Sequence, residues 1–335
     1  MHLQPSDHQF RVDGNDSILD AALQAGLPLN YGCSNGNCGL CRARVLSGDV
    51  SKISHHDFVF GEAEKNMGHI LLCSYTAVGD VVIEAQENAM IPEQLITTRV
   101  KKLTPLTGEI MLLHLHTPRT QRLRFLAGQS VQLDLGGRAA STHPIASCPC
   151  DDRNIEFHIR LTANDAFSQR IQSLKQADTV RVLGPFGDFT LNDHSHRSIL
   201  FLAFDTGFAP VKSLIEHTMQ LDMSESLHLY WTADGEKNHY MHNLVRSWVD
   251  VFDNFSYTPL NANDLYSQAN TAGGWQANAW QEISHALLRH VSAEHDELND
   301  RDIYVAGPDP AVRVAREFLA QHSFPTEQIK SISTR

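Results

Sequence analysis

The chain has 335 residues, which is more than one small domain needs and predicts two or three domains. Its formal net charge of −12 argues against nucleic acid and anionic membranes as partners. No apolar run approaches the length of a membrane span, and the first residues do not resemble a signal peptide. We therefore expect a cytoplasmic protein.

Four of the six cysteines follow the spacing C-x4-C-x2-C with one more cysteine far downstream. Four thiolates hold a [2Fe–2S] cluster with this spacing, because one tight loop supplies three soft ligands and a distant cysteine closes the cage. Gly36 and Gly39 allow the loop to curl around the cluster and to point its N–H groups at the sulfides. The predicted ligands are Cys33, Cys38, Cys41 and Cys73.

A zinc site and four structural thiols without a cofactor are the alternatives for these cysteines. Zinc sites usually combine two short C-x-x-C pairs, so the spacing favours the iron–sulfur cluster. The other two cysteines, Cys148 and Cys150, have only a proline between them, and a disulfide joining them would be strained. We expect them to be free thiols.

The first stretch of the chain has the pattern of a small α+β unit. Its predicted elements are the strand His8–Val12, a helix capped by Asp16 or Ser17 that ends at Ala25, the strand Arg42–Leu46, a turn at Ser47–Asp49 and the strand Val81–Ile83. The motif Tyr31-Gly-Cys…Cys-Gly-Leu-Cys-Arg-Ala-Arg-Val-Leu-Ser-Gly48 resembles the plant-type ferredoxin domain at the N-terminus of bacterial oxygenase reductases. The resemblance implies a β-grasp [2Fe–2S] domain over residues 1–90.

The polar segment Glu87–Gln94 contains a proline and marks a domain boundary. Short predicted strands at regular spacing follow it and favour a small antiparallel barrel; they cover residues 96–103, 110–116, 131–135, 155–160 and 179–183. The segment Gly184-Pro-Phe-Gly-Asp-Phe189 resembles the end of the flavin-binding barrel in the ferredoxin–NADP reductase family. The resemblance implies an FAD-binding β-barrel over residues 95–193.

The flavin motif of that family aligns with Ser141-Thr-His-Pro-Ile-Ala-Ser147. Where the family usually has Arg-x-Tyr-Ser, this chain has Ser141, His143 and Pro144. Losing the arginine removes a charge-assisted bond to the flavin phosphates, for which Arg138 and Arg160 are possible substitutes. The resemblance implies FAD contacts at His143, Pro144, Ile145, Ser147 and Ser168.

The third stretch alternates strands and helices, which predicts a doubly wound parallel sheet over residues 194–335. The predicted elements are strands at 198–203, 227–231 and 302–305, and helices that begin at 208 and span 277–290 and 311–322. The segments from Thr206 to Glu216 and from Ile303 to Pro308 resemble the NAD(P) domain of the same family. The resemblance implies that Thr206 and Gly207 seat the nicotinamide nucleotide, although Asp205 can cap the following helix and compete with a diphosphate.

The whole arrangement resembles the reductase components of bacterial hydroxylases and dioxygenases and the CDP-deoxyhexose reductases. It implies an NAD(P)H-dependent oxidoreductase, in which a flavin must stand between a two-electron hydride donor and a one-electron cluster. We expect the cluster to reduce a protein acceptor, such as an oxygenase or hydroxylase component, at the exposed rim of residues 34–37. No catalytic side chain is predicted.

The alternative belongs to another class of protein. In this interpretation the chain is a one-electron ferredoxin-type carrier, or an interaction subunit, on a reductase scaffold that has lost flavin or nicotinamide binding. Ser141, His143 and Asp205 favour it, because these departures from the family pattern fall at cofactor contacts. The choice between NADH and NADPH stays open.

Overall fold

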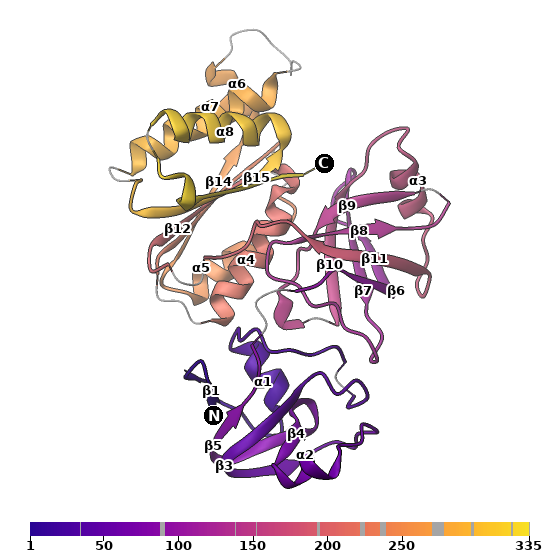
Figure 1. The fold of residues 1–335 in the computed structure, drawn as a ribbon. Coiled ribbons are helices and arrows are strands. Elements are labelled where there is room, and N and C mark those ends of the chain that lie inside the picture. Colours follow the sequence, from indigo (N-terminus) through magenta and orange to yellow (C-terminus); the bar gives the residue numbers. More distant parts are fainter. Residues whose placement is uncertain are drawn as a thin grey trace.

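The computed structural model describes residues 1–33, 35–87, 91–137, 139–151, 153–192, 195–221, 225–234, 239–269, 278–295, 298–322 and 324–334. Within these ranges the chain forms three bodies, each built around its own sheet. The first body lies below the other two in Figure 1, where the middle and third bodies stand side by side.

The first body is a five-stranded mixed sheet with the order β2-β1-β5-β3-β4, packed against helix α1. The central pair β1 and β5 is parallel, and the other neighbours are antiparallel. The side chain of Ser17 accepts a hydrogen bond from the Asp20 amide at 3.0 Å, which confirms the predicted helix cap. The elements are β1 (His2–Gln4), β2 (His8–Gln9), α1 (Ile18–Gln24), β3 (Arg42–Lys52), α2 (Glu62–Asn66), β4 (His69–Leu71) and β5 (Tyr75–Glu84).

Two local predictions for this body are wrong. The strand predicted at His8–Val12 covers only His8–Gln9. The turn predicted at Ser47–Asp49 is instead a bulge inside β3, because the pairing with β5 shifts register on both sides of Ser47. Gly48 has a φ of +88°, which supplies the left-handed conformation that such a bulge needs.

The middle body is an antiparallel six-stranded sheet with the order β10-β7-β6-β11-β8-β9. Its two edge strands approach each other, since the Ala146 amide just after β9 donates to the Glu156 carbonyl of β10 at 2.8 Å. This nearly closed sheet confirms the predicted barrel. The elements are β6 (Gln94–Pro105), β7 (Ile110–His116), β8 (Ser130–Asp134), β9 (Ala140–Pro144), β10 (Asn154–Arg160), α3 (Ala166–Gln172) and β11 (Thr179–Phe186).

Cys148 and Cys150 form a disulfide, so the prediction of free thiols is wrong. The short 3-10 turn Pro149–Asp151 folds the chain back on itself at this point. The two Cα atoms are therefore 5.2 Å apart, which lies within the range that a disulfide spans.

The third body is a five-stranded parallel sheet with the order β14-β13-β12-β15-β16 and helices on both faces. Leu200, Leu202 and Phe204 of β12 pack under α6, α7 and α8, whereas Ile199, Phe201 and Ala203 pack against α4 and α5. This confirms the doubly wound fold. The elements are β12 (Ser198–Phe204), α4 (Phe208–Gln220), β13 (Leu227–Ala233), α5 (His242–Val251), β14 (Phe255–Asn261), α6 (Ala262–Ala269), α7 (Ala279–Glu294), β15 (Arg301–Pro308), α8 (Asp309–Gln321) and β16 (Ile329–Thr334).

Among the described residues, no helix has both the length and the apolar character that crossing a membrane requires.

Candidate functional site

The four predicted cluster cysteines meet at one end of the first body. Within the described ranges, no three His, Cys, Asp or Glu side chains converge closely enough to hold a single metal ion. The four thiols instead stand as two pairs: the Sγ atoms of Cys33 and Cys38 are 3.2 Å apart, and Cys41 shares a hydrogen bond with Cys73. Two pairs of thiols suit two irons, each of which takes two thiolates beside two bridging sulfides.

The loop backbone supports these sulfurs with N–H donors. The Cys38 amide donates to the Cys33 sulfur at 3.4 Å, and the Leu40 amide donates to the Cys38 sulfur at 3.5 Å. Hydrogen bonds from backbone N–H groups to sulfur stabilise thiolates and tune the metal that the thiolates hold. The hydrogen bond from Cys41 lowers the pKa of Cys73 to about 6, while the same bond raises the pKa of Cys41.

Gly36 and Gly39 are required by both conformation and space. Their φ angles are +76° and +72°, in the left-handed region that glycine favours. A Cβ on Gly39 would lie 2.1 Å from the Phe58 ring, and one on Gly36 would lie 2.3 Å from the His56 Cβ. The segment around Phe58 therefore forms the wall of the loop, a role that the sequence pattern does not reveal.

The predicted flavin residues lie at the end of β9 and in the turn after it. His143 is buried and stacks on Phe167 of α3, with ring centroids 4.9 Å apart and planes 25° apart. The amide of Ile145 donates to the Gln129 carbonyl, and the Ser147 hydroxyl accepts from the Glu156 amide at 3.2 Å. The structure thus brings Pro144, Ile145 and Ser147 together beside an aromatic pair.

Ser168 lies in the first turn of α3, where a phosphate contact was predicted. Its amide and hydroxyl both donate to the Asp165 carboxylate, at 2.8 and 2.9 Å. Asp165 therefore caps this short helix itself. The hydroxyl of Ser168 also accepts a hydrogen bond from the Thr162 amide at 3.0 Å, so this serine holds the turn before α3 in place.

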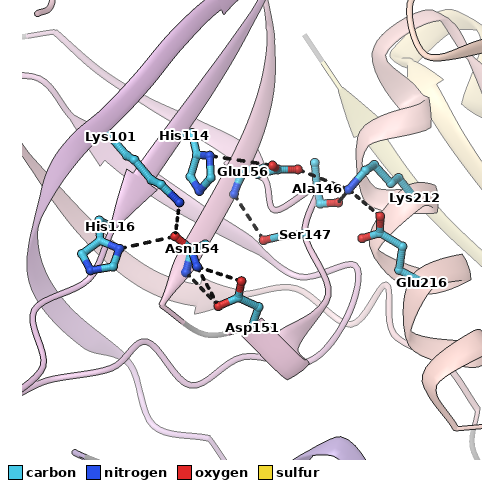
Figure 2. A network of polar contacts seen from close by, with 10 residues as sticks. All are labelled: Lys101, His114, His116, Ala146, Ser147, Asp151, Asn154, Glu156, Lys212 and Glu216. Carbon is cyan, nitrogen blue, oxygen red and sulfur yellow. Dashed lines mark hydrogen bonds and ion pairs between the residues drawn. The ribbon is translucent and has the colours of Figure 1, made fainter. Parts of the chain in front are cut away.

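An ionic network around the buried Lys212 joins the barrel to the third body (Figure 2). Lys212 of α4 is 4% exposed, and its ammonium donates to the Ala146 carbonyl at 3.2 Å. The same group lies 3.3 Å from Glu156 of β10 and 2.7 Å from Glu216 of α4. Lys212 therefore reaches from the third body into the turn that carries the predicted flavin residues.

Arg160 and Asp205 form a second tie between these two bodies. Both oxygens of Asp205 accept hydrogen bonds from Arg160 of β10, whose guanidinium also pairs with Glu109. Asp205 is 3% exposed and has a φ of +53°. The expectation that Asp205 caps the following helix is wrong, because its carboxylate faces the barrel; Arg138, the other candidate phosphate partner, lies outside the described residues.

Thr206 and Gly207 lie where β12 ends, beside β15 and β16. The hydroxyls of Thr206 and Thr334 are 3.4 Å apart, and a Cβ on Gly207 would lie 2.0 Å from the Ala306 carbonyl oxygen. The order of the parallel strands reverses between β12 and β15. Open α/β sheets bind ligands at the carboxyl ends of the strands at such a switch point.

We expect the free energy of unfolding to fall as the pH drops from 6.5 toward 4. Burial lowers the pKa of His228 to about 4 and holds that of His158 well below 6.5. Below pH 6.5 these histidines bind protons in the unfolded chain but stay neutral in the folded chain, so acid favours unfolding. Urea unfolding at several pH values measures this slope. The variant His228→Asn should show a shallower slope, and equal slopes would contradict the prediction.

Each of the three bodies matches a known protein family. The chain matches a 2Fe-2S iron-sulfur cluster binding domain over residues 1–78, an oxidoreductase FAD-binding domain over 97–191 and an oxidoreductase NAD-binding domain over 201–317. These matches decide for the iron–sulfur cluster over zinc. They also identify FAD and NAD(P)H as the further cofactors.

Relatives and solved structures extend the similarity to nearly the whole chain. Protein RfbI of Salmonella typhimurium is 30% identical over 98% of this chain and 94% of its own length. Reductase component 2 of terephthalate 1,2-dioxygenase from Comamonas sp is 30% identical over 89% of this chain and 87% of its own. The Amycolatopsis cytochrome P450 reductase GcoB shares the fold, with a TM-score of 0.59 and 18% identity over 99% of this chain and 98% of its own.

These matches and the two cysteine pairs agree on the chemistry of the molecule. The predicted resemblance, fold class and cofactors are confirmed, and the protein is an electron-transferring oxidoreductase. The chain belongs to the family of NAD(P)H-dependent reductases that join a [2Fe–2S] domain, an FAD domain and an NAD domain in one polypeptide.

Proposed function

We propose that this reductase delivers electrons to an oxygenase component through a [2Fe–2S] cluster held by Cys33, Cys38, Cys41 and Cys73. The arrangement of these thiols as two pairs carries the proposal, because it matches the two irons of such a cluster. The terephthalate 1,2-dioxygenase reductase, among the relatives, supports an oxygenase as the acceptor.

The FAD contacts in this proposal are His143, Pro144, Ile145, Ser147 and Ser168. Bound FAD takes two electrons from a hydride donor and releases them one at a time. The rings of His143 and Phe167 stack on each other next to the turn that Lys212 fixes. Because Arg160 is engaged by Asp205 and Glu109, its guanidinium is not available to flavin phosphates while those pairs are intact.

Thr206 and Gly207 seat the nicotinamide nucleotide in this proposal. They lie in the 3-10 turn Asp205–Gly207 between β12 and α4, at the switch point of the sheet. The N-terminus of a helix, such as that of α4 after this turn, favours the binding of phosphate groups. Gly207 has no space for a side chain, so the turn can approach the end of β15 closely. Asp205 keeps its negative charge turned away toward Arg160, which lessens its competition with a diphosphate.

The acceptor meets the cluster loop at its exposed face in this proposal. Cys38 is exposed while the other three ligands are buried, and Leu40 beside it is 48% exposed. An exposed apolar side chain next to a redox centre can bury itself in a partner interface. Asn37 shares this surface, whereas Ser34 of the predicted rim lies outside the described residues.

The proposal also includes domain boundaries at residues 1–90, 95–193 and 194–335, which follow the three sheets. It includes a cytoplasmic location, because four thiolate ligands persist best in a reducing compartment.

The test is an anaerobic visible spectrum of the purified protein, with released flavin quantified and with FAD and FMN added back separately. NADH and NADPH are then added in separate experiments, followed by dithionite. We expect about one flavin per chain and bleaching of the cluster by one of the two nucleotides. A flavin-loaded protein whose cluster responds only to dithionite would instead support the carrier alternative.

A further inference from the structure

The loop between β7 and β8 of the barrel contacts the start of the cluster loop. The Arg122 amide donates to the Gly32 carbonyl at 3.2 Å, immediately before Cys33. The Arg122 guanidinium lies 3.4 Å from the Asp20 carboxylate of α1. The first body is therefore held on the barrel at the residues that lead into the cluster.

Arg124, two residues further on, makes a different kind of contact. Its guanidinium donates to the Asn30 side-chain oxygen at 2.9 Å and lies 5.1 Å from the centre of the Tyr31 ring. Its backbone is fixed on both sides by Gln94, at 3.1 and 2.8 Å. The cation is thus held rigidly against the two residues that precede Gly32.

The charge of Arg124 is buried without an acidic partner. The residue is 6% exposed, and no carboxylate among the described residues pairs with it. Burial lowers the pKa of this guanidinium, as expected for a cation that has lost its water. Buried charges normally have a counter-charge, and a neutral amide with an aromatic ring compensates for only part of the lost hydration.

The [2Fe–2S] cluster of the proposed function carries a net negative charge. Four thiolates and two sulfides outweigh the charge of two irons, so the centre is anionic and gains one more negative charge on reduction. We propose that Arg124, a residue of the flavin barrel, is the internal counter-charge of the reduced [2Fe–2S] cluster and raises its reduction potential. This inference rests on the cluster in the proposed function but not on flavin or nucleotide binding.

The expected change in reduction potential follows from the Coulomb interaction between two charges. At an effective dielectric constant of about 20, one unit charge roughly 10 Å from another changes an equilibrium constant by about tenfold. We therefore expect Arg124→Gln to lower the equilibrium constant for one-electron reduction about tenfold, which corresponds to about 59 mV. Arg124→Lys keeps the charge and should keep most of the potential.

Two control variants separate the effect of the Arg124 charge on the potential from an effect of the contact between the first body and the barrel. The double variant Asp20→Asn with Arg122→Gln removes the neighbouring ion pair with no change in net charge, so it should leave the potential near that of the wild type. The variant Arg313→Gln removes one positive charge from the exposed side of α8. This helix lies in the upper part of Figure 1, whereas the first body with the cluster loop lies at the bottom. It should also leave the potential unchanged, because distant surface charges are screened by salt.

The measurement is a reductive titration of the full-length, cluster-loaded protein with dithionite in the presence of mediators, followed by electron paramagnetic resonance. A potential in Arg124→Gln equal to that in Arg313→Gln overturns the proposal. An equal loss in Arg124→Gln and in the Asp20/Arg122 double variant also overturns it, since docking alone would then set the potential. Because dithionite supplies the electrons, a failure of nucleotide reduction leaves this test intact.

Discussion

The variant Cys38→Ser loses the [2Fe–2S] cluster and its visible absorption while the flavin stays bound. Cys38 is exposed, so the loss of its sulfur does not open a cavity in the core of the first body. The serine hydroxyl is a harder ligand and a weaker acid than the cysteine thiol. The iron that Cys33 and Cys38 would hold together is then left with the Cys33 thiolate alone. We expect transfer to a protein acceptor to fall by more than about 100-fold, the upper end of what losing an outer-shell partner costs.

Iron and acid-labile sulfide content measure the cluster in this experiment, and ferricyanide reduction measures the flavin separately. Asn37→Ser is the matched control, because it changes an exposed side chain of the same loop and leaves all four thiols in place. Full iron content in Cys38→Ser would contradict the assignment of this ligand. Loss of ferricyanide reduction together with the cluster would show instead that the variant damages the whole protein.

The variant Arg160→Met lowers the free energy of unfolding by about 3–5 kcal/mol, the range for breaking one side of a buried ion pair. Asp205 is almost fully buried, so removal of the guanidinium leaves a carboxylate without water and without its two donors. Because Arg160 belongs to the barrel and Asp205 to the third body, we also expect the two bodies to separate more easily. Urea unfolding followed by intrinsic fluorescence measures the stability.

Two further variants make this prediction specific. The double variant Arg160→Met with Asp205→Asn should recover much of the stability, since no buried charge is then left unpaired. Arg181→Met breaks the exposed pair with Asp134 on the barrel surface and should cost at most about 1 kcal/mol. If Arg160→Met is as stable as Arg181→Met, the pair between the two bodies contributes no more than a surface ion pair.

Local patterns in the sequence predicted the parts of the molecule that local geometry controls. The spacing of the cysteines identifies the cluster loop, because three ligands from one tight turn are placed by the chain itself. The apolar run from Ser198 to Ala203 predicts β12, since a strand buried on both faces has no polar side. The edge strands β14 and β16 were not predicted, because most of their residues are only partly buried and lack a continuous apolar run.

The predictions at Gly48 and at the Cys148–Cys150 pair were wrong because these structures depend on contacts with other parts of the chain. The bulge at Gly48 depends on the pairing of β3 with β5, which a turn-like tripeptide does not show. The disulfide between Cys148 and Cys150 depends on a turn whose path is set by the barrel. Short sequence signals report what a segment prefers, and the partner strand or neighbouring body decides what it does.

The sequence by itself determined the family, the order of the three domains and the four cysteines, because each depends on residue types at short, regular spacings. Only the tertiary structure decided how the thiols pair, that Asp205 turns toward Arg160, and that Arg124 lies over Tyr31. The contacts of Asp205 with Arg160 and of Arg124 with Tyr31 join residues that are far apart along the chain and belong to different bodies. Their geometry follows from how the three bodies pack, where burial makes an unpaired charge costly enough to select its partner.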